Sequence, residues 1–139
     1  MQIDTSSEFG ARVARRLADE TIGWLTTVSS DGTPQPSPIW FLWDGETALI
    51  YSQPNTPKLR HIAANGHVSL NLDGNGRGGD IIILTGEAQV DEAAPSSAEL
   101  PAYQEKYAAG IRQLGMTAES FANAYSVPIR FRPAKLRGH

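Results

Sequence analysis

The sequence predicts a mainly β (α+β) domain in which six antiparallel strands form a barrel with flanking helices. Segments rich in β-branched and aromatic residues recur along the chain, and Asp-Gly turns at 31–32 and 44–45 join neighbouring segments as in hairpins. Helical spacing occurs at the N-terminal end and in one insertion, so strands and helices do not alternate as they do in a doubly wound parallel sheet. The length of 139 residues fits one domain, residues 1–139.

The first predicted element is a helix. Thr5 followed by Glu8 has the spacing of a capping box, and an apolar stripe of Phe9, Val13 and Leu17 follows. The arginines at 12, 15 and 16 lie off this stripe, so we expect them to face solvent. A strand is expected over 21–28.

Two more strands are predicted on either side of the second Asp-Gly turn. The run 39–43, "IWFLW", lacks polar alternation, which predicts one strand with both faces covered. Strands over 67–73 and 80–90 follow. The insertion then carries Tyr103, Tyr107, Ile111 and Leu114 at helical spacing, and a shorter helix capped by Thr117. In the last strand, "VPIRFRPAKLRG", Ile129 and Phe131 are expected to point inward, and Arg130 and Arg132 outward.

Composition restricts the possible functions. A net charge of −3 argues against a nucleic-acid partner, and the absence of cysteine removes thiolate metal sites and cysteine nucleophiles. The three histidines show no metal-ligand spacing, so we expect no metal. The polar N-terminus and short apolar runs predict no signal peptide and no membrane association, and therefore a cytoplasmic protein. No acid–base pair or nucleophile elbow is visible, so no catalytic side chain is assigned; this pattern is typical of proteins whose cofactor carries the chemistry.

The motif "GNGRGG" at 74–79 has the G-x-G-x-x-G spacing of dinucleotide-binding loops. It leaves one predicted strand and enters another, so the helix dipole that binds the pyrophosphate is missing. We therefore interpret the motif as a glycine-rich hairpin loop.

A better anion site lies in "YSQPNTPKLRHIAANG". Thr56 and Pro57 are typical of a helix start, and Lys58 stands in the first turn, where a cation opposes the helix dipole unless an anion is near. Ser52 and Gln53 add polar groups. The residues alone leave two interpretations open: a phosphate cradle, or a capped surface helix with a solvated lysine.

The stretch "PQPSPIWF" also has two interpretations. Prolines at 34, 36 and 38 cannot donate ladder hydrogen bonds, which indicates an edge strand protected against aggregation. The same backbone, beside Trp40 and Phe41, suits a flat heteroaromatic ring.

Taken in order, "DGTPQPSPIWFLWDG", "YSQPNTPKLRHI", "VSLNLD" and "ILTGEA" resemble the pyridoxamine-phosphate-oxidase-like split β-barrels, from Phe9 to the C-terminal strand. Within them the chain is most similar to the group that uses the deazaflavin coenzyme F420 in place of FMN. The resemblance implies a homodimer with cofactors between subunits and a small-molecule substrate. It implies that the cofactor-binding residues are Pro36, Ser37, Pro38, Ile39 and Trp40 along the ring, Ser52, Gln53, Thr56, Pro57 and Lys58 at the phosphate, and Asp80 and Ile81 in the cleft wall.

The FMN-dependent oxidases of this family carry an arginine-containing pattern on the second strand, whereas "PQPSPIWF" is uncharged, which favours F420. Lys58, Arg60 and Arg77 would meet the acidic tail of F420, and the partner's Arg130 and Arg132 would reach the cleft. The resemblance thus implies an F420-dependent oxidoreductase that transfers a hydride to a small organic acceptor. The alternatives are an FMN-binding oxidase or reductase and a non-catalytic flavin- or tetrapyrrole-binding protein.

Overall fold

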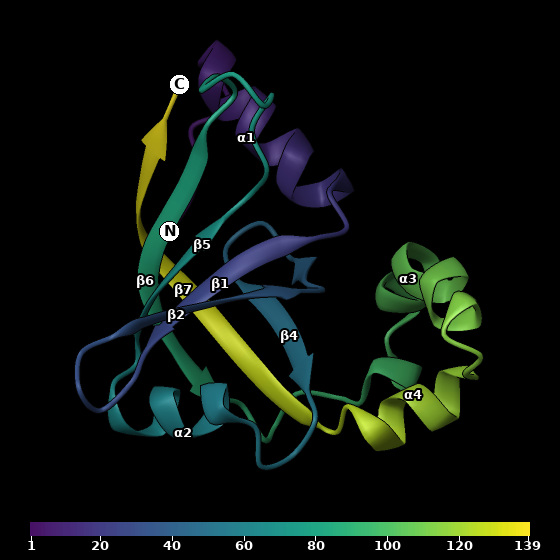
Figure 1. Cartoon of the computed structure of the whole chain (residues 1–139). Helices are drawn as coiled ribbons and strands as arrows, with labels where there is room; N and C mark the ends of the chain where they lie inside the picture. Colours follow the sequence, from purple (N-terminus) through teal and green to yellow (C-terminus); the bar gives the residue numbers. More distant parts are fainter.

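The computed structural model describes residues 1–139, which form one curved antiparallel sheet with four α-helices around it (Figure 1). The sheet contains seven strands in the order β2-β1-β5-β6-β7-β4-β3. The elements are α1 (Glu8–Asp19), β1 (Gly23–Val28), β2 (Pro34–Ile39), β3 (Leu42–Trp43), β4 (Ala48–Ser52), α2 (Pro57–Ala64), β5 (His67–Asn71), β6 (Ile82–Val90), η1 (Ser97–Glu99), α3 (Pro101–Gln113), α4 (Ala118–Ala124) and β7 (Val127–Gly138).

The sheet has an open seam where its two ends meet. The terminal strands β2 and β3 follow each other in the chain, separated only by Trp40 and Phe41, yet no hydrogen-bonded ladder joins them. The three prolines therefore lie on an edge strand, as their missing N–H groups require. The prediction of six strands is wrong, because the run expected to be one strand is two strands interrupted at this seam.

The interruption has a chemical cause in helix α3. The Tyr107 hydroxyl accepts a hydrogen bond from the Phe41 amide at 2.8 Å, and Lys106 Nζ donates to the Phe41 carbonyl at 2.8 Å. The backbone N–H and C=O of Phe41 are thus satisfied by the side chains of Tyr107 and Lys106, and no neighbouring strand pairs with them.

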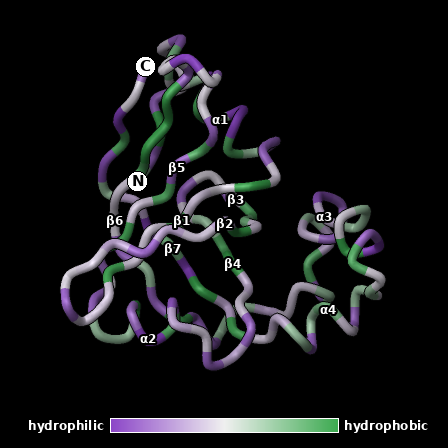
Figure 2. The backbone as a smooth tube through the Cα atoms, viewed as in Figure 1, coloured by the Kyte–Doolittle hydropathy of each residue, from purple (hydrophilic) through white to green (hydrophobic).

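Alternate residues of the strands fill the barrel. Leu25, Leu70, Leu84 and Phe131 are fully buried in one core, and Figure 2 shows apolar residues recurring along β4 and β6 while the tip of the β1–β2 hairpin is hydrophilic. The inward orientation predicted for Ile129 and Phe131 is confirmed.

Helix α1 closes one end of the barrel and corrects two predictions. Ser7, not Thr5, is the N-cap, and its hydroxyl accepts from the Gly10 amide at 2.9 Å. Arg16 does not face solvent: it forms an ion pair with Asp80 at 2.8 Å and donates to the carbonyls of Asp73 and Asp80. The helix is thereby tied to both ends of the β5–β6 loop.

That loop contains the glycine motif. It joins β5 to β6 as a hairpin, and Gly76 and Gly78 adopt positive φ angles of 81° and 79°. The prediction that it is not a nucleotide loop in a strand–helix unit is confirmed, because no helix follows it. None of the helices in the chain has the length and apolarity needed to cross a bilayer.

The insertion between β6 and β7 contains η1, α3 and α4, which stand to one side of the barrel (Figure 1). It packs on β4 through a second apolar cluster that includes Leu49, Tyr51, Tyr103, Tyr107 and Phe121. The predicted Thr117 cap is confirmed, with a capping box to Ser120. Leu114 was expected to continue the apolar face of this helix. It lies beyond the last turn of α3, and its side chain is 54% exposed.

Candidate functional site

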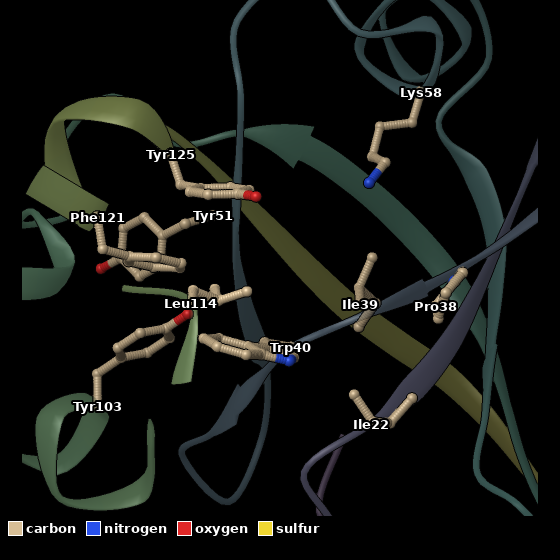
Figure 3. A pocket seen from close by; sticks show the side chains of 10 residues that line it. All are labelled: Ile22, Pro38, Ile39, Trp40, Tyr51, Lys58, Tyr103, Leu114, Phe121 and Tyr125. Atoms are coloured by element: carbon tan, nitrogen blue, oxygen red, sulfur yellow. The ribbon is translucent and has the colours of Figure 1, made fainter. Parts of the chain in front are cut away.

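A cavity of about 300 Å³ lies between the seam of the barrel and the inserted helices (Figure 3). It is in the size range of small-molecule sites. Its walls come from five parts of the fold: the residue before β1, the end of β2, strand β4, the start of α2 and the α3–α4 insertion. The lining residues are Ile22, Pro38, Ile39, Trp40, Tyr51, Lys58, Tyr103, Leu114, Phe121 and Tyr125.

One wall is a continuous stack of aromatic rings. Trp40 lies parallel to Tyr107 at a centroid distance of 4.7 Å and to Phe121 at 5.4 Å, and Phe121 stacks on Tyr125 at 4.5 Å. Gly110 permits this arrangement, because a Cβ at that position would lie 3.0 Å from the Trp40 ring. The indole is therefore held between helix α3 and helix α4, which fixes a flat surface beside the cavity.

Lys58 is the one charged residue of the lining. It is half-buried, its side chain points toward the cavity from α2, and its ammonium group makes no hydrogen bond or ion pair (Figure 3). Burial lowers the pKa of Lys58. An ammonium group that has lost part of its hydration and has no partner in the chain is able to bind an anion.

The start of α2 supplies further donors beside Lys58. The amide of Lys58 has no partner in the helix, whereas the Leu59 amide bonds the Thr56 carbonyl at 3.2 Å and Pro57 has no N–H. The helix end therefore offers fewer free amides than the sequence suggested. The Thr56 hydroxyl does not cap the helix; it pairs with Ser52 Oγ at 3.1 Å.

Two tyrosines of the lining are almost completely buried but differ in their hydrogen bonding. The Tyr51 hydroxyl donates to the Pro95 carbonyl at 2.7 Å, and burial raises the pKa of Tyr51 to about 12. The Tyr103 hydroxyl makes no hydrogen bond within the chain, and burial raises the pKa of Tyr103 still further, with smaller contributions from Tyr107 and Tyr51.

The structure brings together part of the predicted set. Pro38, Ile39, Trp40 and Lys58 line one cavity. Thr56 and Ser52 lie behind Lys58, and Pro57 opens its helix, while Gln53 is exposed on the connecting loop.

The remaining predicted residues lie outside this cavity in the single chain. Pro36 and Ile81 line a separate hollow with Trp24, and Ser37 is half-buried on the edge strand. Asp80, which has a positive φ of 54°, forms ion pairs with Arg12 and Arg16 and so connects the β5–β6 loop to α1.

Sequence reasoning did not assign the aromatic wall to the site. Tyr51, Tyr103, Phe121 and Tyr125 were predicted as strand or helix residues, because aromatic residues at helical spacing are typical of a core. The concentration of three tyrosines and one phenylalanine in the insertion was the available signal.

The arrangement suits a ligand with an anionic group and a flat ring system. The ammonium and amide of Lys58, with Thr56 beside them, provide donors for a phosphate, and Pro38, Ile39 and Trp40 provide an apolar surface for a ring. No acidic side chain lines the cavity, so nothing in it repels an anion.

Comparison with known proteins places the chain in context. A family model described as pyridoxamine 5'-phosphate oxidase matches residues 9–139. None of the curated proteins compared with the chain matches it.

Solved structures share the fold at low sequence identity. A protein named F420 reductase is 24% identical, with a TM-score of 0.64 and coverage of 88% of this chain and 94% of its own. The conserved hypothetical protein Rv2991 from Mycobacterium tuberculosis is 21% identical, with a TM-score of 0.73 and coverage of 94% and 82%. HutZ, the heme storage protein of Vibrio cholerae, is 14% identical, with a TM-score of 0.62 and coverage of 99% and 95%. These likenesses establish the fold.

Proposed function

Because the chain belongs to the pyridoxamine 5'-phosphate oxidase family, we propose that it is an oxidoreductase that uses coenzyme F420 to transfer a hydride to a small organic acceptor. The observation that carries this proposal is Lys58, an unpartnered and half-buried ammonium that faces an apolar cavity beside an aromatic wall. Such a site offers a positive charge for the phosphate and an apolar surface for the flat ring of a phosphate-bearing cofactor.

Each part of the site has a role in this proposal. Lys58 and the first turn of α2 hold the phosphate, with Thr56 beside them and Ser52 fixing the Thr56 hydroxyl. Pro38, Ile39 and Trp40 orient the ring system and keep water from one of its faces. Reduced F420, when bound, supplies a hydride; the protein supplies position and exclusion of water.

The choice of F420 over FMN is supported by the uncharged edge strand, "PQPSPI", and by the fold likeness to the protein named F420 reductase. FMN is the alternative cofactor, and the same phosphate site serves both.

A tetrapyrrole carrier, as the name of HutZ suggests for that protein, is less well supported here. The cavity lining contains no histidine, cysteine or methionine to ligate a heme iron. The raised pKa values of Tyr51 and Tyr103 oppose a phenolate ligand.

We also propose that the chain forms a homodimer in which the C-terminal strand of one subunit approaches the cleft of the other. Arg132 is the residue of that strand available for this role, because it is exposed. Arg130 already donates hydrogen bonds within its own chain, to Asp91 at 3.1 Å and to Thr47 Oγ1 at 3.2 Å.

Titration of the purified protein with F420 and with FMN tests the proposal, using quenching of tryptophan fluorescence as the signal. We expect saturable binding of F420, followed by turnover when reduced F420 meets acceptors such as quinones and enones. Saturable FMN binding with none for F420 would reject the cofactor; tight F420 binding without turnover on any acceptor would favour a carrier.

A further inference from the structure

The β1–β2 strand pair ends at the edge of the cavity. Its last pair places Gly23 opposite Ile39, and the same register would next place Ile22 opposite Trp40. These two residues are not paired in the sheet, and both line the cavity instead (Figure 3). The cavity therefore begins at the point where the two strands separate.

The prolines of β2 show which backbone hydrogen bonds are missing at this point. The prolines at 34, 36 and 38 cannot donate, so the hydrogen-bonded pairs are the alternate ones, of which Gly23–Ile39 is the last. Because hydrogen-bonded pairs recur at every second residue of an antiparallel ladder, the next one would join Thr21 and Phe41. No backbone hydrogen bond connects these two residues.

The hydroxyl group of Tyr107 lies between them. It accepts from the Phe41 amide at 2.8 Å and donates to the Thr21 carbonyl at 2.7 Å. The Phe41 carbonyl, 3.0 Å from the same oxygen, accepts from Lys106 Nζ at 2.8 Å, so the single hydroxyl proton is free for Thr21. Two hydrogen bonds in series thus take the place of the one, about 2.9 Å long, that would close the ladder.

Tyr107 is held firmly in this position. The residue is 2% exposed, and its ring stacks on Trp40 at a centroid distance of 4.7 Å and an interplanar angle of 8°. Burial raises the pKa of Tyr107, so the hydroxyl keeps the proton that it donates to Thr21. Tyr107 does not itself line the cavity, so it acts on the cavity through Ile22 and Trp40.

We propose that Tyr107 is a positioning residue: its hydroxyl holds the end of the β1–β2 ladder open, and the separation of Ile22 from Trp40 makes room for the flat ring of the cofactor. The identity of the ligand rests on the proposed function, whereas the opening of the ladder does not depend on it. The shape of the cavity is thereby assigned to a side chain of the insertion that lies outside the lining.

The first test measures the opening without any ligand. In a non-hydrogen-bonded antiparallel pair the Cα atoms are about 4.5 Å apart, which brings the Hα atoms together and gives a strong nuclear Overhauser effect. Trp24–Pro38 is such a pair and serves as the internal reference. We expect no comparable Hα signal between Ile22 and Trp40 in the wild type, and its appearance in Tyr107→Ala, where the ladder can close.

Both expectations can fail separately. A wild-type signal between Ile22 and Trp40 as strong as the reference would overturn the open ladder. Absence of the signal in folded Tyr107→Ala would overturn the role of the hydroxyl.

Tyr107→Phe extends the test, because it keeps the stacked ring and removes only the hydroxyl. The Phe41 amide then loses its acceptor, and its hydrogen exchange should become about tenfold faster, as for the loss of one hydrogen bond. Tyr51→Phe is the matched control: it removes another hydroxyl of the same cluster, bonded to Pro95, and should leave the exchange rate of Phe41 unchanged. An unchanged rate in Tyr107→Phe, or an equal increase in Tyr51→Phe, would overturn the inference. If Tyr107→Ala does not fold, this comparison and the wild-type spectrum decide.

The second test separates the inference from the proposed function. In Tyr107→Ala the Kd for F420 should increase on the order of 10- to 100-fold, comparable to the loss of one buried apolar side chain. The Kd for inorganic phosphate at Lys58, followed by phosphorus NMR, should stay constant. An equal loss for phosphate, or an unchanged Kd for F420, would overturn the positioning role. Absence of F420 and FMN binding to the wild type, with the Hα signals as expected, would reject the proposed function and leave the open ladder in place.

Discussion

Replacement of Lys58 by glutamine is expected to weaken cofactor binding while it stabilises the empty protein. The substitution keeps most of the side-chain length and removes one charge. In the empty protein this charge is half-buried and has no partner, and its lowered pKa shows that the fold disfavours it. Removing it therefore relieves a desolvation cost, and the midpoint of urea unfolding should rise.

The magnitude of the binding loss follows from the surroundings of the ammonium. Two unit charges about 4 Å apart attract by about 1 kcal/mol in water and by about 4 kcal/mol at an effective dielectric constant of 20. A half-buried group lies between these limits, in agreement with the ~1.5–3 kcal/mol typical of hydrogen bonds to charged groups. The Kd for F420 or FMN should therefore increase about 10- to 150-fold.

The assay is a fluorescence titration of wild type and variants at two salt concentrations. Arg15→Gln is the control, because Arg15 is exposed on α1, away from the cavity and from β7, and loses the same charge. An unchanged Kd in Lys58→Gln, or an equal loss in Arg15→Gln, would refute the placement of the anion. A lower midpoint of unfolding would refute the claim that the lysine is unsatisfied in the empty protein.

Three further predictions concern helix packing, helix capping and a buried lysine. Gly110→Ala adds a methyl group 3.0 Å from the Trp40 ring, so we expect a changed near-UV circular dichroism signal and weaker ligand binding, even though alanine favours the helix by about 1 kcal/mol; an unchanged spectrum would contradict the packing. Ser7→Ala should lower the free energy of unfolding by about 1 kcal/mol, measured in urea, because the Gly10 amide loses its cap, and Thr5→Ala should not. Burial lowers the pKa of Lys106 to about 8, so between pH 8 and its ordinary value of 10.5 unfolding takes up a proton. The stability of wild type relative to Lys106→Met should therefore rise with pH across that window, and a flat or falling difference would show that the lysine is not desolvated.

The strands were predictable where local chemistry decides them. The Asp-Gly turns, the prolines of the edge strand and the alternation of β5 and β7 depend on neighbours in the sequence, and the structure agrees with each. The break at Phe41 was not predictable, because it depends on Tyr107 and Lys106, which lie in an insertion far along the chain. Arg16 was misjudged for a similar reason: its partners are backbone carbonyls of a distant loop.

In the candidate site, too, some features depend on neighbours in the sequence and others on contacts between distant segments. The start of α2 and the position of Lys58 follow from the local pattern at Thr56 and Pro57. The aromatic wall required the fold, since Trp40 and Phe121 come together only when the insertion docks on the barrel. An apolar residue that lines a cavity and one that fills a core have the same sequence pattern.

The division of the cavity between two structural units has a consequence for how such a protein diversifies. Lys58 and the end of β2 belong to the barrel, whereas Tyr103, Leu114, Phe121 and Tyr125 all belong to the segment between two adjacent strands, β6 and β7. β6 and β7 pair with each other along nine residues, but the segment between them also bonds the Phe41 backbone through Tyr107 and Lys106, so an exchanged segment must keep these contacts to leave the seam in place. Exchanging the segment between homologues would therefore change the aromatic walls of the cavity and leave Lys58 in place.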